Sequence, residues 1–142
     1  MQQFERVKLD IQGAVATITL DHVEVMNAIS IDMIGGVVDA LDAIAEKGGV
    51  RCLVLTGQGK AFCTGANLQG RGGSIGSKKG GAGKALEANF HPMLRKLRDA
   101  PYPIVSAVNG PAAGAGMSLA LMGDIVLCAR SAYFLQAFRR IG

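Results

Sequence analysis

The chain has 142 residues, a length that predicts one domain with a buried core. Hydrophobic residues make up 49% and charged residues 18%, which excludes a disordered chain, and the 20 glycines follow no Gly-x-y period, which excludes collagen. The N-terminus has no apolar signal core, and the three cysteines form no C-x-x-C pair. We therefore expect a cytoplasmic protein with reduced thiols.

The net charge of +4 comes from one segment of the chain. Residues 70–84 carry four basic residues and no acidic one, whereas the rest of the chain has 11 of each sign. We interpret this segment as a flexible, basic, glycine-rich loop that meets an anionic small molecule. Binding to nucleic acid is disfavoured, because the excess charge forms no extended basic face and aromatic residues make up only 5%.

Residues 100–123 carry no charge and are numerous enough to span a bilayer. Three prolines and the pair Asn109-Gly110 interrupt this stretch. These residues break helices, so the stretch predicts two short elements and no membrane span.

The first half of the chain predicts a hairpin followed by a helix. Residues 6–11 and 14–20 are short β-rich runs, which we interpret as paired strands. Ser30 is the predicted N-cap of a helix over 31–46, where apolar residues recur at the spacing of one buried face. Lys47-Gly48-Gly49 is typical of a helix end.

The second half alternates apolar strands with helices. Residues 52–56 form a continuous apolar run, which predicts a strand buried on both faces of a parallel sheet. The elements that follow are a helix over 86–98, a strand over 104–108, a helix over 116–122, a strand over 125–128 and a short strand over 133–135. This order predicts an α/β fold with crossover connections.

Two segments rich in glycine and alanine, residues 60–68 and 109–118, each follow a predicted strand. Ligands of open α/β sheets lie beyond the carboxyl ends of the strands, where small residues let a ligand approach the backbone. Two backbone N–H groups that converge there would make an oxyanion hole. Small residues also serve turns and close helix packing, and for either segment alone that interpretation stays open. Neither segment matches the dinucleotide fingerprint or the phosphate loop.

Taken together, the two segments resemble the enoyl-CoA hydratase/isomerase superfamily, whose fold is called crotonase-like. The matching stretches read GKAFCTGANL over 59–68 and AVNGPAAGAGMSLALMGDI over 107–125. The resemblance implies a ββα-repeat fold, a spiral of parallel strands with flanking helices. It also implies that residues 1–142 are the N-terminal portion of the core domain, with the C-terminal half missing. For a full-length protein it implies a homotrimer or a hexamer.

The resemblance assigns the two oxyanion donors to the backbone N–H groups of Ala66 and Ala115. It implies an acyl-CoA thioester as the partner, with coenzyme A as part of the substrate and with no separate cofactor or metal. The residues that it assigns to substrate binding are Val25, Ala28, Ala61, Gly65, Asn67, Leu68, Gly114 and Ser118. This chain departs from the family pattern at Asn67, where Asp is usual, and at Val25, where a basic residue is usual.

The resemblance also bears on the reaction. Hydratases of the family use two glutamates, and the matching positions here hold Ser118 and Phe138, neither of which can act as a carboxylate base. This favours the branch of ring-1,2-epoxyphenylacetyl-CoA isomerases, in which a catalytic Asp follows the residue that matches Gly142. We therefore expect double-bond isomerisation in a full-length protein and no turnover by these residues alone. The alternatives are a non-catalytic acyl-CoA-binding paralogue and a nucleic-acid-binding protein that uses residues 70–84.

Overall fold

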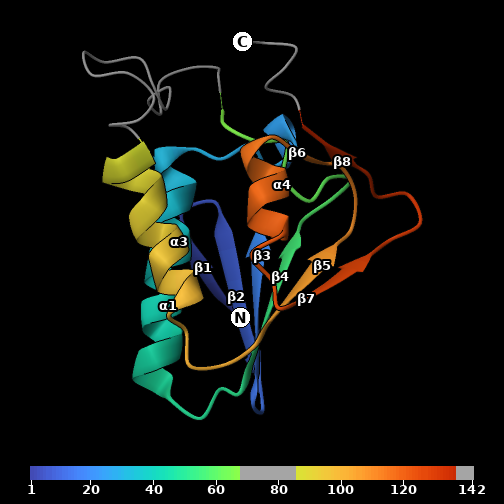
Figure 1. Ribbon diagram of the computed structural model, residues 1–142. Coiled ribbons are helices and arrows are strands. Elements are labelled where there is room, and N and C mark those ends of the chain that lie inside the picture. Colours follow the sequence, from blue (N-terminus) through green and yellow to red (C-terminus); the bar gives the residue numbers. More distant parts are fainter. Residues whose placement is uncertain (68–85, 137–142) are drawn as a thin grey trace.

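The computed structural model describes residues 1–67 and 86–136 (Figure 1). The predicted basic loop over 70–84 and the candidate residues Leu68 and Phe138 lie outside these ranges. Within the described ranges, no helix is long and apolar enough to cross a membrane.

Six strands form one mixed sheet in the order β1-β2-β3-β4-β5-β7. The pairs β1-β2 and β2-β3 are antiparallel, and the pairs from β3 to β7 are parallel. The hairpin and the three parallel strands after it were expected, whereas β1 was not. The strands are β1 (Gln2–Phe4), β2 (Val7–Gln12), β3 (Val15–Leu20), β4 (Cys52–Gly57), β5 (Ile104–Val108) and β7 (Ile125–Cys128).

Figure 1 shows α1 and α3 side by side on one face of the sheet, with α4 beside the small pair of strands β6 and β8. Pro92 lies in the first turn of α3, where the missing N–H of proline costs no helical hydrogen bond. The helices are the 3-10 turn η1 (Val23–Val25), α1 (Ile31–Lys47), the π-helical turn η2 (Leu86–Phe90), α3 (His91–Arg98) and α4 (Ala115–Ala120).

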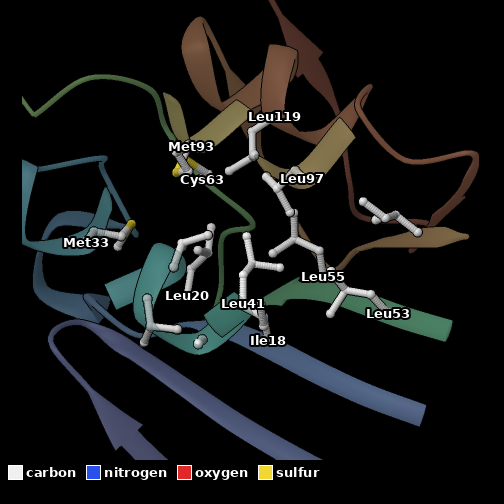
Figure 2. Close-up of a cluster of buried hydrophobic side chains, with 14 of the residues drawn as sticks. Ile18, Leu20, Met33, Leu41, Leu53, Leu55, Cys63, Met93, Leu97 and Leu119 are labelled. Carbon is white, nitrogen blue, oxygen red and sulfur yellow. The ribbon is translucent and has the colours of Figure 1, made fainter. Parts of the chain in front are cut away.

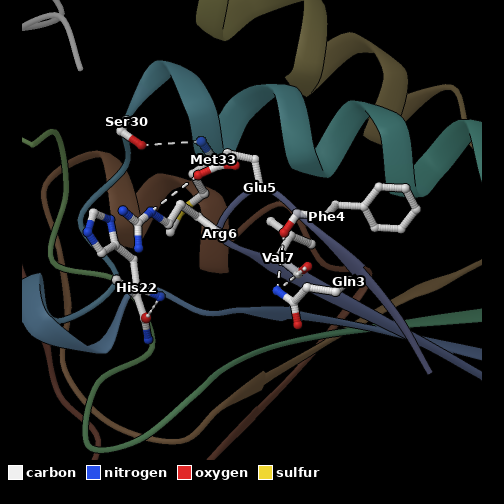
Figure 3. A network of polar contacts seen from close by, with 9 residues as sticks. Gln3, Phe4, Glu5, Arg6, Val7, His22, Ser30 and Met33 are labelled. Carbon is white, nitrogen blue, oxygen red and sulfur yellow. Dashed lines mark hydrogen bonds and ion pairs between the residues drawn. The ribbon is translucent and has the colours of Figure 1, made fainter.

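Helix α1 begins and ends where the sequence predicts. The Ser30 hydroxyl accepts a hydrogen bond from the Met33 N–H at 3.2 Å, which satisfies one of the free donors of the first turn (Figure 3). At the other end Gly48 has φ +67°, and its N–H donates to the Ile44 carbonyl at 3.1 Å. Local sequence signals are therefore enough to set the bounds of this helix.

The hydrophobic core lies between the sheet and the helices α1 and α3 (Figure 2). Alternate residues of the central strands point into it, as the pleat of a strand requires. Side chains from α1 and α3 fill the space opposite. The core residues labelled in Figure 2 include Ile18, Leu20, Met33, Leu41, Leu53, Leu55, Met93, Leu97 and Leu119.

One expectation about the strands was wrong. In β4 only alternate residues are buried: Leu53 and Leu55 face the helices, whereas Val54 and Thr56 are half-buried. The reason is that α1 and α3 cover a single face of the sheet. The short strand expected over 133–135 is present, and it lies outside the main sheet.

That short strand is β8 (Phe134–Leu135), and it pairs in parallel with β6 (Ala112–Ala113) as a separate two-stranded sheet. The N–H of Ala112 donates to the Tyr133 carbonyl at 2.9 Å, and the N–H of Gly114 donates to the Leu135 carbonyl at 2.9 Å. These bonds hold the segment that enters α4.

Candidate functional site

The two glycine- and alanine-rich segments lie against each other, backbone to backbone. The N–H groups of Phe62 and Cys63 both point to the Pro111 carbonyl, at 3.1 and 3.2 Å. In return, the Ala113 N–H donates to the Cys63 carbonyl at 3.0 Å. Segments about fifty residues apart in sequence therefore meet as one short ladder beyond the ends of β4 and β5.

This contact requires glycine at two positions. A Cβ atom on Gly116 would lie 2.1 Å from the Cys63 carbonyl oxygen, closer than any real side chain allows. Gly65 has φ +98°, and a Cβ atom there would lie 2.9 Å from the Ala113 carbonyl oxygen and 3.6 Å from the Ala115 nitrogen. The backbone next to Ala66 thus lies close to the first residue of α4, with no room for a side chain at Gly65.

The backbone around Ala66 is held on both sides by one residue. The Ile29 N–H donates to the Gly65 carbonyl at 2.7 Å, and the Asn67 N–H donates to the Ile29 carbonyl at 2.8 Å. Within residues 1–67 and 86–136, the N–H of Ala66 itself donates no hydrogen bond, and neither does the N–H of Ala115. Two free donors therefore come from segments whose backbones touch.

A cavity of about 310 Å³ lies beside this junction. Four of the residues that the sequence assigns to the site line it, namely Val25, Ala28, Ala66 and Asn67. The Thr64 hydroxyl lies 3.3 Å from the Val25 carbonyl oxygen and so joins two walls of the cavity. The complete lining is Glu24, Val25, Met26, Ala28, Thr64, Ala66 and Asn67.

The other predicted residues lie behind or beside the cavity. Ala61, Gly65 and Gly114 are buried and are not among the lining residues. Ser118 is exposed on α4, and its N–H donates to the Gly114 carbonyl at 3.2 Å. The structure thus brings Gly65 and Gly114 to the junction of the two segments but leaves the Ser118 side chain at the surface.

The arrangement agrees with what comparison with known proteins finds. Residues 10–142 match the family model described as enoyl-CoA hydratase/isomerase. The chain belongs to this family. Its fold is crotonase-like, as predicted, and solved structures that resemble it include enoyl-CoA hydratases and an enoyl-CoA hydratase/isomerase.

Two curated members of the family show the extent of the similarity. The 1,2-epoxyphenylacetyl-CoA isomerase of Escherichia coli K12 is 39% identical over 132 residues, which cover 93% of this chain and 50% of that protein. A probable enoyl-CoA hydratase of Rhodobacter capsulatus is 42% identical over 139 residues, which cover 98% and 52%. The chain thus spans about half the length of these relatives.

Solved structures of the family agree with the fold. An enoyl-CoA hydratase/carnithine racemase from Magnetospirillum magneticum has a TM-score of 0.87 at 30% identity, covering 99% of this chain and 52% of that one. A protein of the same family from Mycobacterium abscessus has a TM-score of 0.85 at 33% identity, covering 96% and 53%. The assignment of residues 1–142 to the N-terminal portion of the core domain stays a prediction.

The sequence did not indicate several residues that line or support the candidate cavity. Glu24 and Met26 line the cavity, but no motif containing them pointed to a ligand, and Thr64, although it lies in the segment 60–68, was not singled out. Asn27, which lies between the lining residues Met26 and Ala28, is fully buried and has φ +55°. Asparagine tolerates this left-handed conformation better than most residues, so the short polar side chain before Ala28 was the available signal.

The titratable groups near the junction are structural. Burial raises the pKa of the Cys63 thiol to about 12, so it stays protonated at neutral pH and is a poor nucleophile. At the opposite end of the sheet, where β5 begins, the Asp124 carboxylate accepts the Ile104 N–H at 2.7 Å. Among the described residues, no three His, Cys, Asp or Glu side chains are placed to hold a metal ion.

Proposed function

We propose that this chain binds an acyl-CoA thioester and that the N–H groups of Ala66 and Ala115 form the oxyanion hole for its carbonyl oxygen. The observation that supports this most directly is the contact at Gly65, whose Cβ position lies 3.6 Å from the Ala115 nitrogen. Both donors lack a partner among the described residues, and Ala66 lines the cavity. Ala115 is not among the residues that line the cavity, so the proposed position of the carbonyl oxygen is between the cavity wall at Ala66 and the start of α4, where both donors would gain a partner.

The chemistry follows from where charge develops. When a proton leaves the carbon next to a thioester carbonyl, negative charge moves to the carbonyl oxygen and an enolate forms. Two N–H donors stabilise this oxyanion more than the neutral carbonyl, which lowers the barrier. Removing one donor of this kind typically slows a reaction by about 10²–10³-fold. Because the donors belong to the backbone, alanine can occupy both positions.

The cavity is proposed to receive the pantetheine arm of the substrate. Its volume of about 310 Å³ is at the lower end of small-molecule sites, which suits part of coenzyme A and not the whole. Val25 and Ala28 supply apolar walls, and Asn67 supplies a polar group at the rim. The basic residues of 70–84 remain the proposed partners of the phosphates.

For the whole protein we propose double-bond isomerisation in preference to hydration. The support is chemical: Ser118 and Phe138 stand at the positions that carry the hydratase glutamates, and neither side chain can take up a proton as a carboxylate does. The same two residues favour a second candidate, a non-catalytic acyl-CoA-binding protein. The two candidates share the oxyanion hole and differ in whether the bound thioester loses its α-proton.

The oxyanion hole can be tested with butanoyl-CoA carrying ¹³C at the thioester carbonyl. Ala115 is the first residue of α4, where proline is tolerated, so Ala115→Pro removes the N–H without breaking the helix. We expect the carbonyl resonance of the bound ligand to return towards its value in water and the affinity to fall about tenfold. Ala115→Gly, which keeps the N–H, is the control.

A carbonyl resonance that Ala115→Pro leaves unchanged would contradict the role of this donor. Ala66→Pro is the matching test for the other donor and should have the same effect. Free coenzyme A has no thioester carbonyl, so its affinity should stay within about twofold in both proline variants.

Deuterium exchange separates the enzyme from the binding protein. In D₂O, a chain that enolises butanoyl-CoA replaces the protons next to its carbonyl with deuterium. We expect these 142 residues to bind the thioester without exchange, in keeping with the absence of a glutamate at position 118. Exchange would instead show that a base is present in this chain, which would favour the enzyme and overturn that expectation.

A further inference from the structure

Two asparagine side chains from different parts of the chain converge on one carbonyl oxygen. The Nδ2 group of Asn27 donates to the Ala61 carbonyl at 2.9 Å, and the Nδ2 group of Asn109 donates to the same oxygen at 3.3 Å. We propose that Asn27 and Asn109 form an asparagine clamp that positions the Ala66 N–H relative to the Ala115 N–H. For the role of these two donors, the proposal rests on the proposed function.

Asn27 is a fully satisfied polar group inside the protein. It is 0% exposed, and besides Ala61 its Nδ2 group donates to the Gln58 carbonyl at 2.9 Å. Its Oδ1 atom accepts the His22 N–H at 2.8 Å. A buried amide with three partners fixes the groups that it contacts, since any displacement leaves a buried donor or acceptor unpaired.

Asn109 holds the same turn from the opposite side. Its Oδ1 atom accepts the Gly57 N–H at 3.1 Å, and its Nδ2 group donates to the Gly59 carbonyl at 3.0 Å as well as to Ala61. Residues 57–61 join β4 to the first site segment. Three of the carbonyls in this turn accept from the two asparagines, so amide groups outside the turn determine its shape.

Each asparagine also begins a stretch that contacts the segment around Ala66. Asn27 lies two residues before Ile29, whose N–H and carbonyl bond on either side of Ala66. Asn109 lies two residues before Pro111, whose carbonyl accepts two N–H groups of the first site segment. The clamp therefore fixes the start of the segment and both of its neighbours at once. Losing the Asn27 amide would loosen the hold of Ile29 on Ala66, and losing the Asn109 amide would loosen the hold of Pro111 on Phe62 and Cys63.

The first experiment compares Asn27→Ala, Asn109→Ala and Ile44→Val for binding of butanoyl-CoA and of free coenzyme A. Ile44 is buried at the far end of α1, so its variant loses stability without touching the clamp. We expect both clamp variants to lose fivefold to tenfold of the preference for the thioester, together with part of the ¹³C carbonyl shift. Ile44→Val should keep both. Folded clamp variants that match the wild type in both readouts would overturn the proposal.

Amide hydrogen exchange separates failure of the clamp from failure of the proposed function. The Cys63 N–H bonds to the Pro111 carbonyl, so it should exchange at least tenfold faster in Asn109→Ala than in Ile44→Val. The Asn67 N–H bonds to the Ile29 carbonyl and should respond in the same way to Asn27→Ala. Unchanged exchange at both amides would overturn the clamp, whatever the ligand.

If the wild-type chain does not distinguish butanoyl-CoA from coenzyme A, the proposed function fails, and the exchange rates still decide whether the clamp exists. Should Asn27→Ala fail to fold, Asn109→Ala carries both readouts. Asn109 is half-buried, so its removal leaves fewer groups without solvent or a partner.

Discussion

Two regions of the molecule are held together in different ways. Beneath α1, large apolar side chains such as Leu55 and Leu41 fill the space between helix and sheet. At the junction of the two site segments, small residues let one backbone touch another, as at Gly116 and the Cys63 carbonyl. Stability in the first region comes from the area of apolar side chain that is buried. The geometry of the second depends on glycines, because a Cβ atom at these positions would collide with a neighbouring carbonyl.

This difference decides what each region tolerates. A core of interdigitating side chains can repack around a substitution of similar volume, at a modest cost. A contact between backbones has no rotamer to change, so an added carbon must move a peptide group. We therefore expect deletion of atoms to be most harmful in the core and addition of atoms to be most harmful at the junction.

The largest effect is expected from Leu55→Ala in β4. Leu55 is 1% exposed and lies in the centre of the core, so the variant loses burial and leaves a cavity. We expect the free energy of unfolding to fall by about 4 kcal/mol, within the usual range for buried leucines. Urea unfolding followed by circular dichroism measures it. A loss below about 1 kcal/mol would mean that neighbouring side chains move to fill the cavity, which would contradict a closely packed core.

Gly116→Ala should cost nearly as much by adding a single carbon. The new Cβ would lie 2.1 Å from the Cys63 carbonyl oxygen, and we expect a loss of about 3 kcal/mol, at the upper end of overpacking. Combining it with Cys63→Ala sharpens the comparison. Removing the sulfur leaves the carbonyl in place, so the double variant should regain little stability. Full recovery would show that the contact is between side chains and not between backbones.

Raising the pH should weaken the junction through Cys63. Burial raises the pKa of this thiol from 9.0 to about 12, so above pH 9 the unfolded chain releases a proton that the folded chain retains. Stability from this group is complete below pH 9 and is lost as pH rises towards 12. At pH 10 the loss is about 1.4 kcal/mol. The measurement is urea unfolding at pH 8 and pH 10, with Cys63→Ala as the reference.

Other groups titrate over the same pH range in both proteins, so the quantity that counts is the difference between wild type and Cys63→Ala. That difference should shrink as the pH rises. A constant difference would show that water reaches the thiol, contrary to the close backbone contact around it.

Ser30→Ala should have an effect of about 1 kcal/mol, because it removes the side-chain acceptor of the Met33 N–H at the start of α1. Ser30 connects the two regions, since it lies between Ile29, which bonds on either side of Ala66, and α1, which covers the core. Ser30→Thr keeps a hydroxyl, so its free energy of unfolding should fall by only a few tenths of a kcal/mol. Equal losses in both variants would assign the effect to packing and not to the cap.

The sequence predicts those features of the two regions that depend on neighbouring residues. The Ser30 cap, the Gly48 end and the bounds of β5 follow from residues next to one another. The two site segments were also found, because runs of small residues after apolar strands are visible in the chain. A family resemblance then supplied the roles of Ala66 and Ala115, which no periodicity indicates.

What the sequence could not predict depends on contacts between distant residues. Strands β6 and β8 have two residues each, too few to show an alternating pattern. Asn27 and Asn109 act through bonds to carbonyls 31 to 50 positions away, and an amide side chain in a sequence does not indicate its partner. Both kinds of feature become visible only when the backbone is placed in space.

The smallest effect, and the only gain, is expected from Gly35→Ala. Gly35 is exposed within α1, and a Cβ atom there would meet nothing within 4 Å. Alanine in a helix restricts the unfolded chain and costs less backbone entropy than glycine, so the free energy of unfolding should rise by about 0.5–1 kcal/mol. The same urea measurement detects it.

The neighbouring glycine makes this prediction a direct test of the comparison. A Cβ atom on Gly36 would lie 2.2 Å from the Glu5 carbonyl oxygen, a contact between backbones like that at Gly116. Gly36→Ala has the same helix propensity as Gly35→Ala, so a loss in the first and a gain in the second isolate the contact from the propensity. If both variants gained stability, the turn between β1 and β2, which contains Glu5, would be free to move aside, and close backbone contact would not by itself forbid an added carbon.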